Sequence, residues 1–405
     1  MPAECFFATC PRGLESALER ELSAIGAQRT QVRPGGVAFC GDLTLAIRAN
    51  LESRVASRIL WRVGEGRYTS AEDIYAGART LSWADWFGPE RTIRVDVSAI
   101  DSPLRSLDFV TLRIKDAVCD KLRDLSGSRP SVDTARPDVR VRAFLDSKRW
   151  TMYLDTSGDP LFKRTWRESG GIAPLRENLA AGILMLSGWM PGVPLLDPMC
   201  GSGTFLVEAA QMSLLRAPGL KRDFAFQKLR PFDLKTFQQA KSALQARALP
   251  ARPLPIFGRD RDTSVLEFAR QNLKNAGVAE AVQLRCGDVL DATAPAPEGV
   301  IVVNPPYGIR LGDAAQSRAL YPKLGDLLKR RFAGWRAFIL SADAELPKAI
   351  HLQTSRRTPL FNGAIECRLY EYRMVPGSLR KERSIGEGRR PERASKRSPN
   401  CPTRS

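Results

Sequence analysis

The chain has 405 residues, of which 43% are hydrophobic and 26% are charged, so it is long enough for two or three soluble domains with sizeable cores. Lys and Arg number 62 against 44 Asp and Glu, which gives a formal net charge of +18. This composition excludes a membrane-embedded protein and indicates either a polyanionic partner or a generic basic surface.

The eight cysteines and the single histidine, His351, do not form a metal-binding pattern. No cysteine has the short paired spacing of zinc or redox sites, so we expect no metal and interpret the thiols as those of a cytoplasmic protein. The N-terminus lacks the basic and apolar segments of a signal peptide. Prolines and glycines interrupt the uncharged run 178–196, which favours a helix, a turn and a strand over a membrane span.

The first portion of the chain predicts strands mixed with helices. Hydrophobic spacing predicts a strand over 5–10, a helix over 14–25, a strand over 37–39, and a helix that begins after Asp42 and continues to Ile59. Four arginines are interspersed among the apolar residues of this second helix: Arg48, Arg54, Arg58 and Arg62. They are expected to line either a nucleic-acid face or an ordinary solvated side.

Alternating hydrophobic residues then predict strands over 91–98, 139–145 and 150–154, with a helix over 109–125. Four basic residues lie on or beside these strands: Arg140, Arg142, Lys148 and Arg149. A basic segment of strands and helices without a catalytic constellation is typical of a binding module.

Residues 1–155 resemble the N-terminal half of THUMP-containing RNA methyltransferases, most strongly in Ala-Asn-Leu-Glu-Ser-Arg-Val-Ala-Ser-Arg-Ile-Leu (49–60) and Asp-Thr-Ser-Gly (155–158). The resemblance implies a ferredoxin-like region followed by a THUMP domain that binds structured RNA. The stretch Ala-Pro-Leu-Arg-Glu-Asn-Leu-Ala-Ala, with a helix start near Pro174, resembles the helix that enters the catalytic domain in ribosomal RNA guanine methyltransferases of this family.

A basic connector precedes that helix. Lys163, Arg164 and Arg167 are candidates for contacts with phosphates, although connectors are commonly basic without such a role.

A short strand over 193–197 is predicted to end in Asp197, and a turn containing Gly201 and Gly203 leads into a helix. A strand, a glycine turn and a helix form the first unit of a doubly wound sheet, where ligands bind at the carboxyl ends of the strands. A nicotinamide cofactor is a rival interpretation, but Leu206 occupies the third position of the dinucleotide fingerprint, which is normally Gly or Ala.

Each of the next three predicted strands also ends in a polar side chain; they cover 255–258, 282–286 and 300–303. Asp260 is placed to accept hydrogen bonds from a ribose, Asp288 suits an adenine amino group, and Asn304 ends the third strand. Together with Asp197, these are four polar groups in register beside a glycine loop. Turn chemistry alone is a poor explanation for such a series.

Two prolines and an aromatic residue follow Asn304. Pro305 and Pro306 cannot donate to a sheet ladder, and they hold the Asn304 side chain and the Pro305 carbonyl in a stiff, extended turn. Two rigid acceptors followed by Tyr307 suit the gripping of a planar amino group and stacking on its ring. The simpler alternative is a strand that ends in a proline turn.

The motifs Asp-Pro-Met-Cys-Gly-Ser-Gly-Thr-Phe, Gly-Arg-Asp-Arg-Asp, Cys-Gly-Asp-Val and Asn-Pro-Pro-Tyr-Gly resemble those of class I S-adenosylmethionine-dependent methyltransferases acting on exocyclic amino groups. With the THUMP-like half, residues 1–375 resemble the bacterial 23S ribosomal RNA guanine-2-amino methyltransferases. This implies S-adenosylmethionine as cofactor without a metal, and large-subunit ribosomal RNA or its precursor as partner, with no membrane and no obligate protein partner. A second methyltransferase follows in the larger bifunctional version, and that activity is expected to be absent here.

The resemblance also assigns roles to residues of the cofactor site. Asp197, Gly201 and Gly203 are expected to form the cofactor loop, Asp260 to bind the ribose hydroxyls and Asp288 to contact adenine.

The target site implied by the resemblance consists of four consecutive residues: Asn304, Pro305, Pro306 and Tyr307. In the cofactor site, Arg261 departs from the small residue expected between two acids. The division of labour between Asp260 and Asp262 therefore stays open.

We predict three segments: 1–156 is an α+β ferredoxin-like plus THUMP RNA-binding region, 157–375 is an α/β class I methyltransferase domain with a Rossmann-like, mostly parallel doubly wound sheet, and 376–405 is a basic disordered tail. A helix over 315–332 and strands over 337–340 and 365–372 are expected to complete the sheet. The tail is expected either to add nonspecific RNA affinity or to act as an inert solubilising end.

The predicted activity is methylation of the 2-amino group of a guanine in 23S ribosomal RNA. A transfer RNA guanine-N2 methyltransferase and a catalytically silent RNA-binding ribosome-assembly factor are the alternatives. DNA adenine and protein-glutamine methyltransferases share the Asn-Pro-Pro-Tyr motif, but the THUMP-like half and the basic composition disfavour both.

Overall fold

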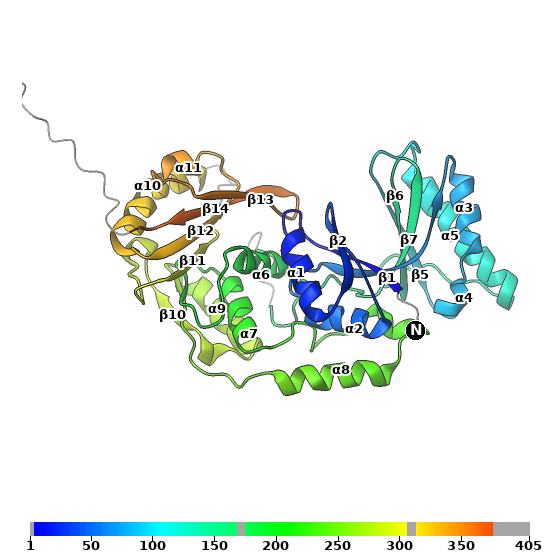
Figure 1. Ribbon diagram of the computed structural model, residues 1–405, viewed down its shortest axis with the longest axis horizontal. Helices are drawn as coiled ribbons and strands as arrows, with labels where there is room; N and C mark the ends of the chain where they lie inside the picture. The colour runs from blue at the N-terminus through cyan, green and yellow to red at the C-terminus, as the bar shows by residue number, and fades with distance from the viewer. Residues whose placement is uncertain (1–3, 168–174, 306–312, 376–405) are drawn as a thin grey trace, which may run out of the picture.

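The computed structural model describes residues 4–167, 175–305 and 313–375, and its architecture rests on two seven-stranded sheets. Figure 1 shows the two sheets in separate lobes, with helices α1 and α6 between them and α8 below α2. The first lobe is built from the N-terminal part of the chain and the second from the C-terminal part. This confirms an α+β region followed by an α/β domain.

The first sheet has the strand order β2-β3-β1-β4-β7-β6-β5, and only the β5–β6 pair is parallel. Its strands are β1 Glu4–Thr9, β2 Gln28–Arg33, β3 Gly36–Gly41, β4 Arg58–Arg67, β5 Ile93–Ala99, β6 Val139–Leu145 and β7 Arg149–Asp155. Strand β4 pairs with β1 on one side and β7 on the other. The ferredoxin-like and THUMP-like segments therefore share one continuous sheet.

Helices cover one face of this sheet. They are α1 Glu15–Ile25, α2 Leu43–Glu52, α3 Ala71–Thr80, α4 Trp83–Trp86 and α5 Leu107–Ser126. Strand β6 alternates strictly between buried and half-buried residues, and its buried residues belong to the same core as Val110 and Ile114 of α5. The alternation of hydrophobic and polar residues in the sequence therefore indicates a sheet with one covered face.

The predicted helix after Asp42 is wrong in its C-terminal half. Asp42 caps α2 as expected, since its Oδ1 accepts from the Leu45 amide at 2.7 Å, but α2 ends at Glu52. The following residues turn, and Ile59 lies in β4. The apolar residues recur at helical spacing only because the buried face of a strand happens to continue the helical stripe. Long-range pairing of β4 with β1 and β7 decides the conformation.

The second sheet has the order β10-β9-β8-β11-β12-β14-β13, in which the strands from β10 to β12 are parallel and β14 is antiparallel to both neighbours. Its strands are β8 Leu195–Asp197, β9 Ile256–Asp260, β10 Gln283–Cys286, β11 Gly299–Val303, β12 Trp335–Ser341, β13 Arg356–Asn362 and β14 Ile365–Arg373. All five residues of β11 are buried, as a central parallel strand requires. The predicted mostly parallel, doubly wound sheet is confirmed.

The helices of the second half are α6 Glu177–Leu186, α7 Thr204–Ser213, α8 Leu234–Arg247, α9 Thr263–Asn275, α10 Asp313–Arg331 and α11 Leu346–Ala349, with 3₁₀ turns η1 Ala225–Lys228, η2 Ala279–Ala281 and η3 Val289–Asp291. None of the helices within the described ranges is both long and apolar enough to cross a membrane. The strands missed from sequence are β2, β4 and β13, and the missed helices are α3, α4, α8 and α11.

A buried charge cluster joins the two halves. The Glu208 carboxylate of α7 has no exposed surface, and it accepts from Arg164 Nε at 3.1 Å and lies 3.4 Å from Arg54 Nη1. Arg54 lies in the turn between α2 and β4, and its carbonyl accepts from Arg164 Nη2 at 2.9 Å. Neither interpretation of Arg54 from sequence holds, because its side chain is buried at the joint and is absent from both a nucleic-acid face and a solvated helix side.

Candidate active site at the carboxyl edge of the second sheet

The strand order of the second sheet reverses at β8, which pairs with β9 on one side and β11 on the other. Parallel strands on the two sides of such a point lead their connections away in opposite directions, which leaves a crevice at the carboxyl edge. The residues that leave this edge are Asp197 at the end of β8, Asp260 at the end of β9, and Asn304 immediately after β11. The chain thus brings three of the polar strand ends to one edge.

The glycine loop lies between β8 and α7. Gly201 has a φ of +53° and Gly203 a φ of +81°, both in the left-handed region that L side chains rarely adopt. A Cβ added to Gly201 would meet no atom within 4 Å, whereas one on Gly203 would come within 3.3 Å of the Ala269 side chain. Gly203 therefore permits close packing of α7 on α9, and Gly201 leaves open space above the strand ends.

Asp260 and Asp262 use their carboxylates differently. Asp260 Oδ2 accepts from the Gly201 amide at 2.9 Å and its Oδ1 accepts from the Asp262 amide at 3.1 Å, so this carboxylate lies against the glycine loop. Asp262 caps α9, with Oδ1 accepting from the Ser264 amide at 2.9 Å. Hydrogen bonds from Ser264 lower the pKa of Asp262. Of the two acids, Asp260 is the one that faces the loop.

Asp197 is only 2% exposed, and its Oδ1 accepts from the Met199 amide at 3.2 Å. Burial raises the pKa of the Asp197 carboxyl well above its ordinary value, and the nearby Asp260 carboxylate raises it further. Asp288 is half-buried and begins η3, where its Oδ1 accepts from the Leu290 amide at 2.8 Å. Its carbonyl accepts from Arg259 Nη1 at 2.9 Å, which fixes this turn beside β9.

Asn304 has a side-chain acceptor without a hydrogen-bond donor in the described part of the chain. Its Oδ1 is buried and finds no hydrogen-bond donor among the described residues. A buried amide oxygen without a donor is costly, so such an atom calls for an explanation. Pro305 is buried beside it. The remaining predicted target-site residues, Pro306 and Tyr307, lie outside the described residues.

Arg167 holds the connector against the start of α7, a structural role that the sequence reasoning missed. Its Nη2 donates to Thr204 Oγ1 at 2.6 Å and its Nε lies 2.6 Å from Glu177 Oε1 at the start of α6. Thr204 follows Gly203 directly, so Arg167 ties the connector to the glycine loop. The basic composition of the connector was the feature visible in the sequence, and it suggested contacts with phosphates. In the structure, Arg164 and Arg167 instead point inward to carboxylates.

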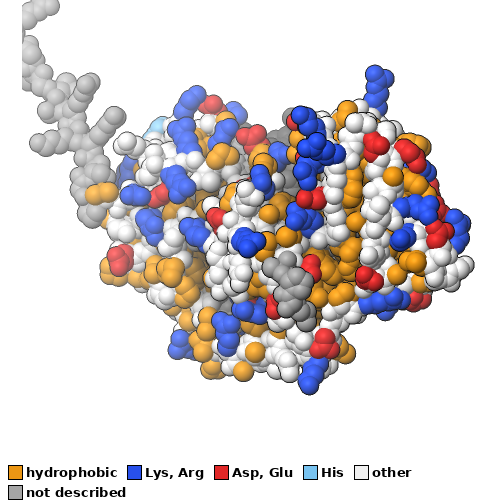
Figure 2. Space-filling view, turned by 45° about the vertical axis from the view of Figure 1, so that its right-hand side comes forward, with side chains coloured by type: hydrophobic (Ala, Val, Ile, Leu, Met, Phe, Trp, Pro, Cys, Tyr) orange, Lys and Arg blue, Asp and Glu red, His pale blue; other side chains and the backbone are white. Residues whose placement is uncertain are grey.

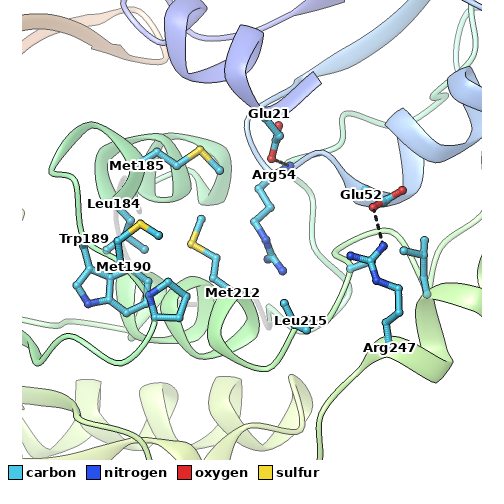
Figure 3. Close-up of a pocket in the computed structure, with 13 residues that line it drawn as sticks. Glu21, Glu52, Arg54, Leu184, Met185, Trp189, Met190, Met212, Leu215 and Arg247 are labelled. Carbon is cyan, nitrogen blue, oxygen red and sulfur yellow. Dashed lines mark hydrogen bonds and ion pairs between the residues drawn. The ribbon is translucent and has the colours of Figure 1, made fainter. Parts of the chain in front are cut away.

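A cavity of about 310 Å³ lies elsewhere, between the two halves. Figure 3 shows Met185, Met190 and Met212 on one side and Arg54 on the other, with Glu52 and Arg247 paired at its margin at 3.6 Å. Met212 stands near the C-terminal end of α7, opposite the glycine loop, and none of the polar strand ends lines this cavity. Within the described ranges, no group of three or more His, Cys, Asp or Glu side chains is arranged to hold a metal ion.

Three family models match consecutive parts of the chain. The RlmL ferredoxin-like domain matches residues 5–60, the THUMP domain matches 68–155, and the RMKL-like methyltransferase domain matches 164–371.

Relatives with curated names are similar over nearly the whole chain. The ribosomal RNA large subunit methyltransferase K/L of Aeromonas hydrophila is 38% identical over 402 residues, which cover 94% of this chain and 56% of that protein. A Synechocystis protein named as an RNA methyltransferase is 36% identical over 91% of this chain and 96% of its own length. The chain thus spans about half the length of the K/L relatives it matches and nearly all of the Synechocystis relative.

Solved structures agree with these matches. The methyltransferase SMU.472, crystallised with S-adenosylhomocysteine, has a TM-score of 0.84 and 30% identity and covers 92% of this chain and 98% of its own. A Listeria monocytogenes protein described as an N6-adenine-specific DNA methylase has the same TM-score at 29% identity, with 92% of this chain and 97% of that chain covered. The matched domains, the strand order and the glycine loop all support one assignment. The chain belongs to the THUMP-containing, S-adenosylmethionine-dependent RNA methyltransferase family with an RMKL-like catalytic domain.

Proposed function

We propose that this protein methylates the exocyclic 2-amino group of a guanine in 23S ribosomal RNA. The names of the K/L relatives supply the substrate class, and the buried Oδ1 of Asn304 supplies the chemistry. An oxygen that lacks a donor among the described residues, at the edge where doubly wound sheets bind their ligands, is suited to accept a hydrogen bond from a substrate amino group.

The proposed role of Asn304 follows from the electronic structure of the target. The lone pair of a guanine amino group is delocalised into the ring, so the nitrogen is a poor nucleophile. If Asn304 Oδ1 and the Pro305 carbonyl accept its two N–H bonds, the nitrogen becomes more tetrahedral and its lone pair is directed away from both acceptors. Positioning and dipole placement by these two groups are then the protein's contribution to catalysis.

The cofactor site is proposed on the opposite side of the same edge. S-adenosylmethionine, when bound, supplies a methyl group activated by its sulfonium. The open space over Gly201 fits the close approach of such a ligand to the backbone, and Asp260, held against the loop, is assigned to the ribose hydroxyls. Asp288 is assigned to the adenine amino group, while the buried Asp197 shapes the floor of the loop. Asp262 is left to cap α9.

The first half is proposed to hold the RNA. Figure 2 shows Lys and Arg side chains spread over both lobes on one face of the molecule, among fewer acidic ones. Some of the arginines noted in the sequence are already paired, since Arg142 Nε lies 3.1 Å from the Asp155 carboxylate and Arg140 lies 3.5 Å from Asp96. These pairs contribute to the sheet, so the RNA contacts must come from other basic groups as well.

The test is methyl transfer from labelled S-adenosylmethionine to large-subunit ribosomal RNA and, in parallel, to transfer RNA. The proposal expects label in the ribosomal RNA. Label only in transfer RNA would retain the chemistry and replace the substrate. Label in neither RNA, with the cofactor bound normally, would support the alternative of a silent assembly factor.

A further inference from the structure

Two arginines lie over aromatic rings at the seam between the first half and the active-site edge. Arg12, in the loop between β1 and α1, lies over the Phe361 ring at 5.9 Å from its centroid. Arg176, immediately before α6, lies over the Phe162 ring at 4.8 Å. We name these four residues, together with Gly363, the seam ledge.

The ledge belongs to the same edge as the candidate active site. Strand β14 runs antiparallel to β12, with Ser341 opposite Arg368, so the turn between β13 and β14 lies beyond the carboxyl end of β12. Phe361 and Gly363 are in or beside that turn. Figure 1 shows β13 extending towards α1, where the Gly13 backbone packs against the carbonyl of Pro359.

The other side of the ledge is attached to the first sheet. The Leu161 amide donates to the Ser57 carbonyl at 2.8 Å, which places Phe162 beside the start of β4. Arg176 is held from a second direction, because a Cβ on Gly363 would come within 3.3 Å of its Nη2. A guanidinium held between a ring and a turn loses less freedom when it binds a ligand.

The guanidinium groups of the ledge are also available. Arg12 and Arg176 are exposed, and neither forms an ion pair with a carboxylate in the described part of the chain. The neighbouring Arg164 and Arg167 are buried or half-buried and are each paired with a glutamate. If the ledge arginines served only to join the halves, we would expect them to resemble this second pair.

We propose that the seam ledge holds the RNA strand that flanks the target nucleotide, with the two guanidinium groups binding backbone phosphates. An arginine that stacks through its face keeps its N–H donors free at its edge, and these donors match phosphate oxygens. This inference rests on the proposed function, since it takes RNA as the substrate. It adds a specific route for the RNA strand from the first half of the protein to Asn304.

The experiment compares Arg12→Ala, Arg176→Ala and the double variant with Arg330→Ala. Arg330 is an exposed arginine in the last turn of α10, which precedes β12 and so lies at the amino edge of the same sheet. Affinity for a large-subunit ribosomal RNA transcript is measured across a salt series with S-adenosylhomocysteine present. Methyl transfer is measured with the same transcript, cofactor affinity by calorimetry, and folding by thermal melting.

The double variant should bind the transcript roughly tenfold more weakly, equivalent to the loss of about 1.4 kcal/mol. Its salt slope should fall by about 1.4, as expected for two lost contacts with single-stranded phosphates. The KM for RNA should rise with little change in kcat, cofactor affinity and melting temperature should be retained, and Arg330→Ala should match the wild type. Lysine at both positions should restore the salt slope but only part of the affinity, because it keeps the charge without the planar fork of N–H donors.

The proposal is overturned if the ledge variants and Arg330→Ala have the same RNA affinity and salt slope. It is overturned equally if the loss appears in kcat alone. A wild-type protein that methylates no RNA would instead defeat the proposed function. The salt slopes are measured without turnover, so the two failures are distinguishable, and the single Arg12→Ala variant keeps the test intact if a change at Arg176 disturbs α6.

Discussion

In the first sheet only the β5–β6 pair is parallel, whereas in the second the strands from β10 to β12 all run in the same direction. Antiparallel neighbours send successive strand ends to opposite edges, so polar groups at strand ends are dispersed. Parallel strands send them to one edge, which is where Asp197, Asp260 and Asn304 meet. Two sheets with the same number of strands thus differ in whether their polar strand ends lie together at one edge.

Polar side chains in the first half have a different role, because they join the two sheets. Asn50 Nδ2 donates to Thr156 Oγ1 at 2.9 Å, and Ser157 Oγ donates to Asn50 Oδ1 at 2.6 Å. Across the joint, Asn178 Nδ2 of α6 donates to Ser57 Oγ at 3.0 Å. The stretches that carry the family resemblance in this half are therefore engaged in attaching one sheet to the other.

The largest effect is expected at the buried charge cluster that joins the two halves. Glu208→Ala leaves Arg54 and Arg164 buried without their carboxylate, and removing one partner of a buried pair costs about 3–5 kcal/mol. Urea unfolding at neutral pH measures the loss. As a control, Glu267→Ala removes the partner of Arg270 in an exposed pair and should cost less than about 1 kcal/mol. Equal losses in the two variants would show that the buried cluster does not hold the halves together.

A change at Asn304 separates chemistry from binding. Asn304→Ala removes the buried acceptor and should lower kcat by roughly 10²–10³-fold, the effect typical of one lost group that stabilises a transition state. RNA affinity should remain close to that of the wild type. Single-turnover methyl transfer and RNA titration measure the two quantities, and Gln283→Ala at the amino edge serves as the control. Equal losses of turnover and RNA affinity would contradict the assigned role.

The glycine loop can be tested with a matched backbone change. Gly201→Val places a branched side chain in the open space over the strand ends, and the affinity for S-adenosylmethionine should fall by about tenfold or more, or about 1.4 kcal/mol. Gly127→Val puts the same residue at the left-handed C-cap of α5, where a Cβ also meets nothing within 4 Å. Both variants should lose some stability, but only the first should weaken cofactor binding in calorimetry. Comparable cofactor affinity in both would remove Gly201 from the cofactor site.

The smallest expected effect concerns pH. The folded-state pKa of Asp197 is raised, chiefly by burial, so the folded cofactor-free protein holds a proton more tightly than the unfolded chain does. Stability should therefore fall as the pH rises from about 4, near the unfolded value, through the folded pKa. Asp197→Asn should flatten this slope in unfolding experiments while keeping an oxygen for the Met199 amide.

Asp262 provides the opposite sign for comparison. Its pKa is lowered by hydrogen bonds from Ser264, so its contribution is present above the unfolded pKa and is lost as the pH falls through the folded pKa. Asp262→Asn should therefore change the acid limb only. If Asp197→Asn changed the same limb, the direction assigned to the buried carboxyl would be wrong.

The sequence predicted the second half better than the first because its signals are local. A buried β-branched strand, a glycine turn and the start of a helix follow one another within a few residues, so the loop at Gly201 and the strand ending before Asn304 could both be placed. In the first half, the alternation of β6 and β7 was equally local and was placed correctly.

What the sequence could not predict depends on distant partners. Ile59 continues a helical spacing but pairs as a strand with Ala8, about fifty positions away, and no local pattern records that. Strand β13 contains Pro359 and lies at the edge of its sheet, where a proline is tolerated but the strand signal is weak. The pairing of Arg54 with Glu208 joins different halves, so it became visible only in the folded chain.

The most direct test of the account identifies the methylated nucleoside. Large-subunit ribosomal RNA lacking its modifications is incubated with the protein and deuterated S-adenosylmethionine, digested to nucleosides and analysed by mass spectrometry. The proposed function predicts labelled 2-methylguanosine with the wild type and almost none with Asn304→Ala. Label in N6-methyladenosine, or 2-methylguanosine formed equally by Asn304→Ala, would contradict it.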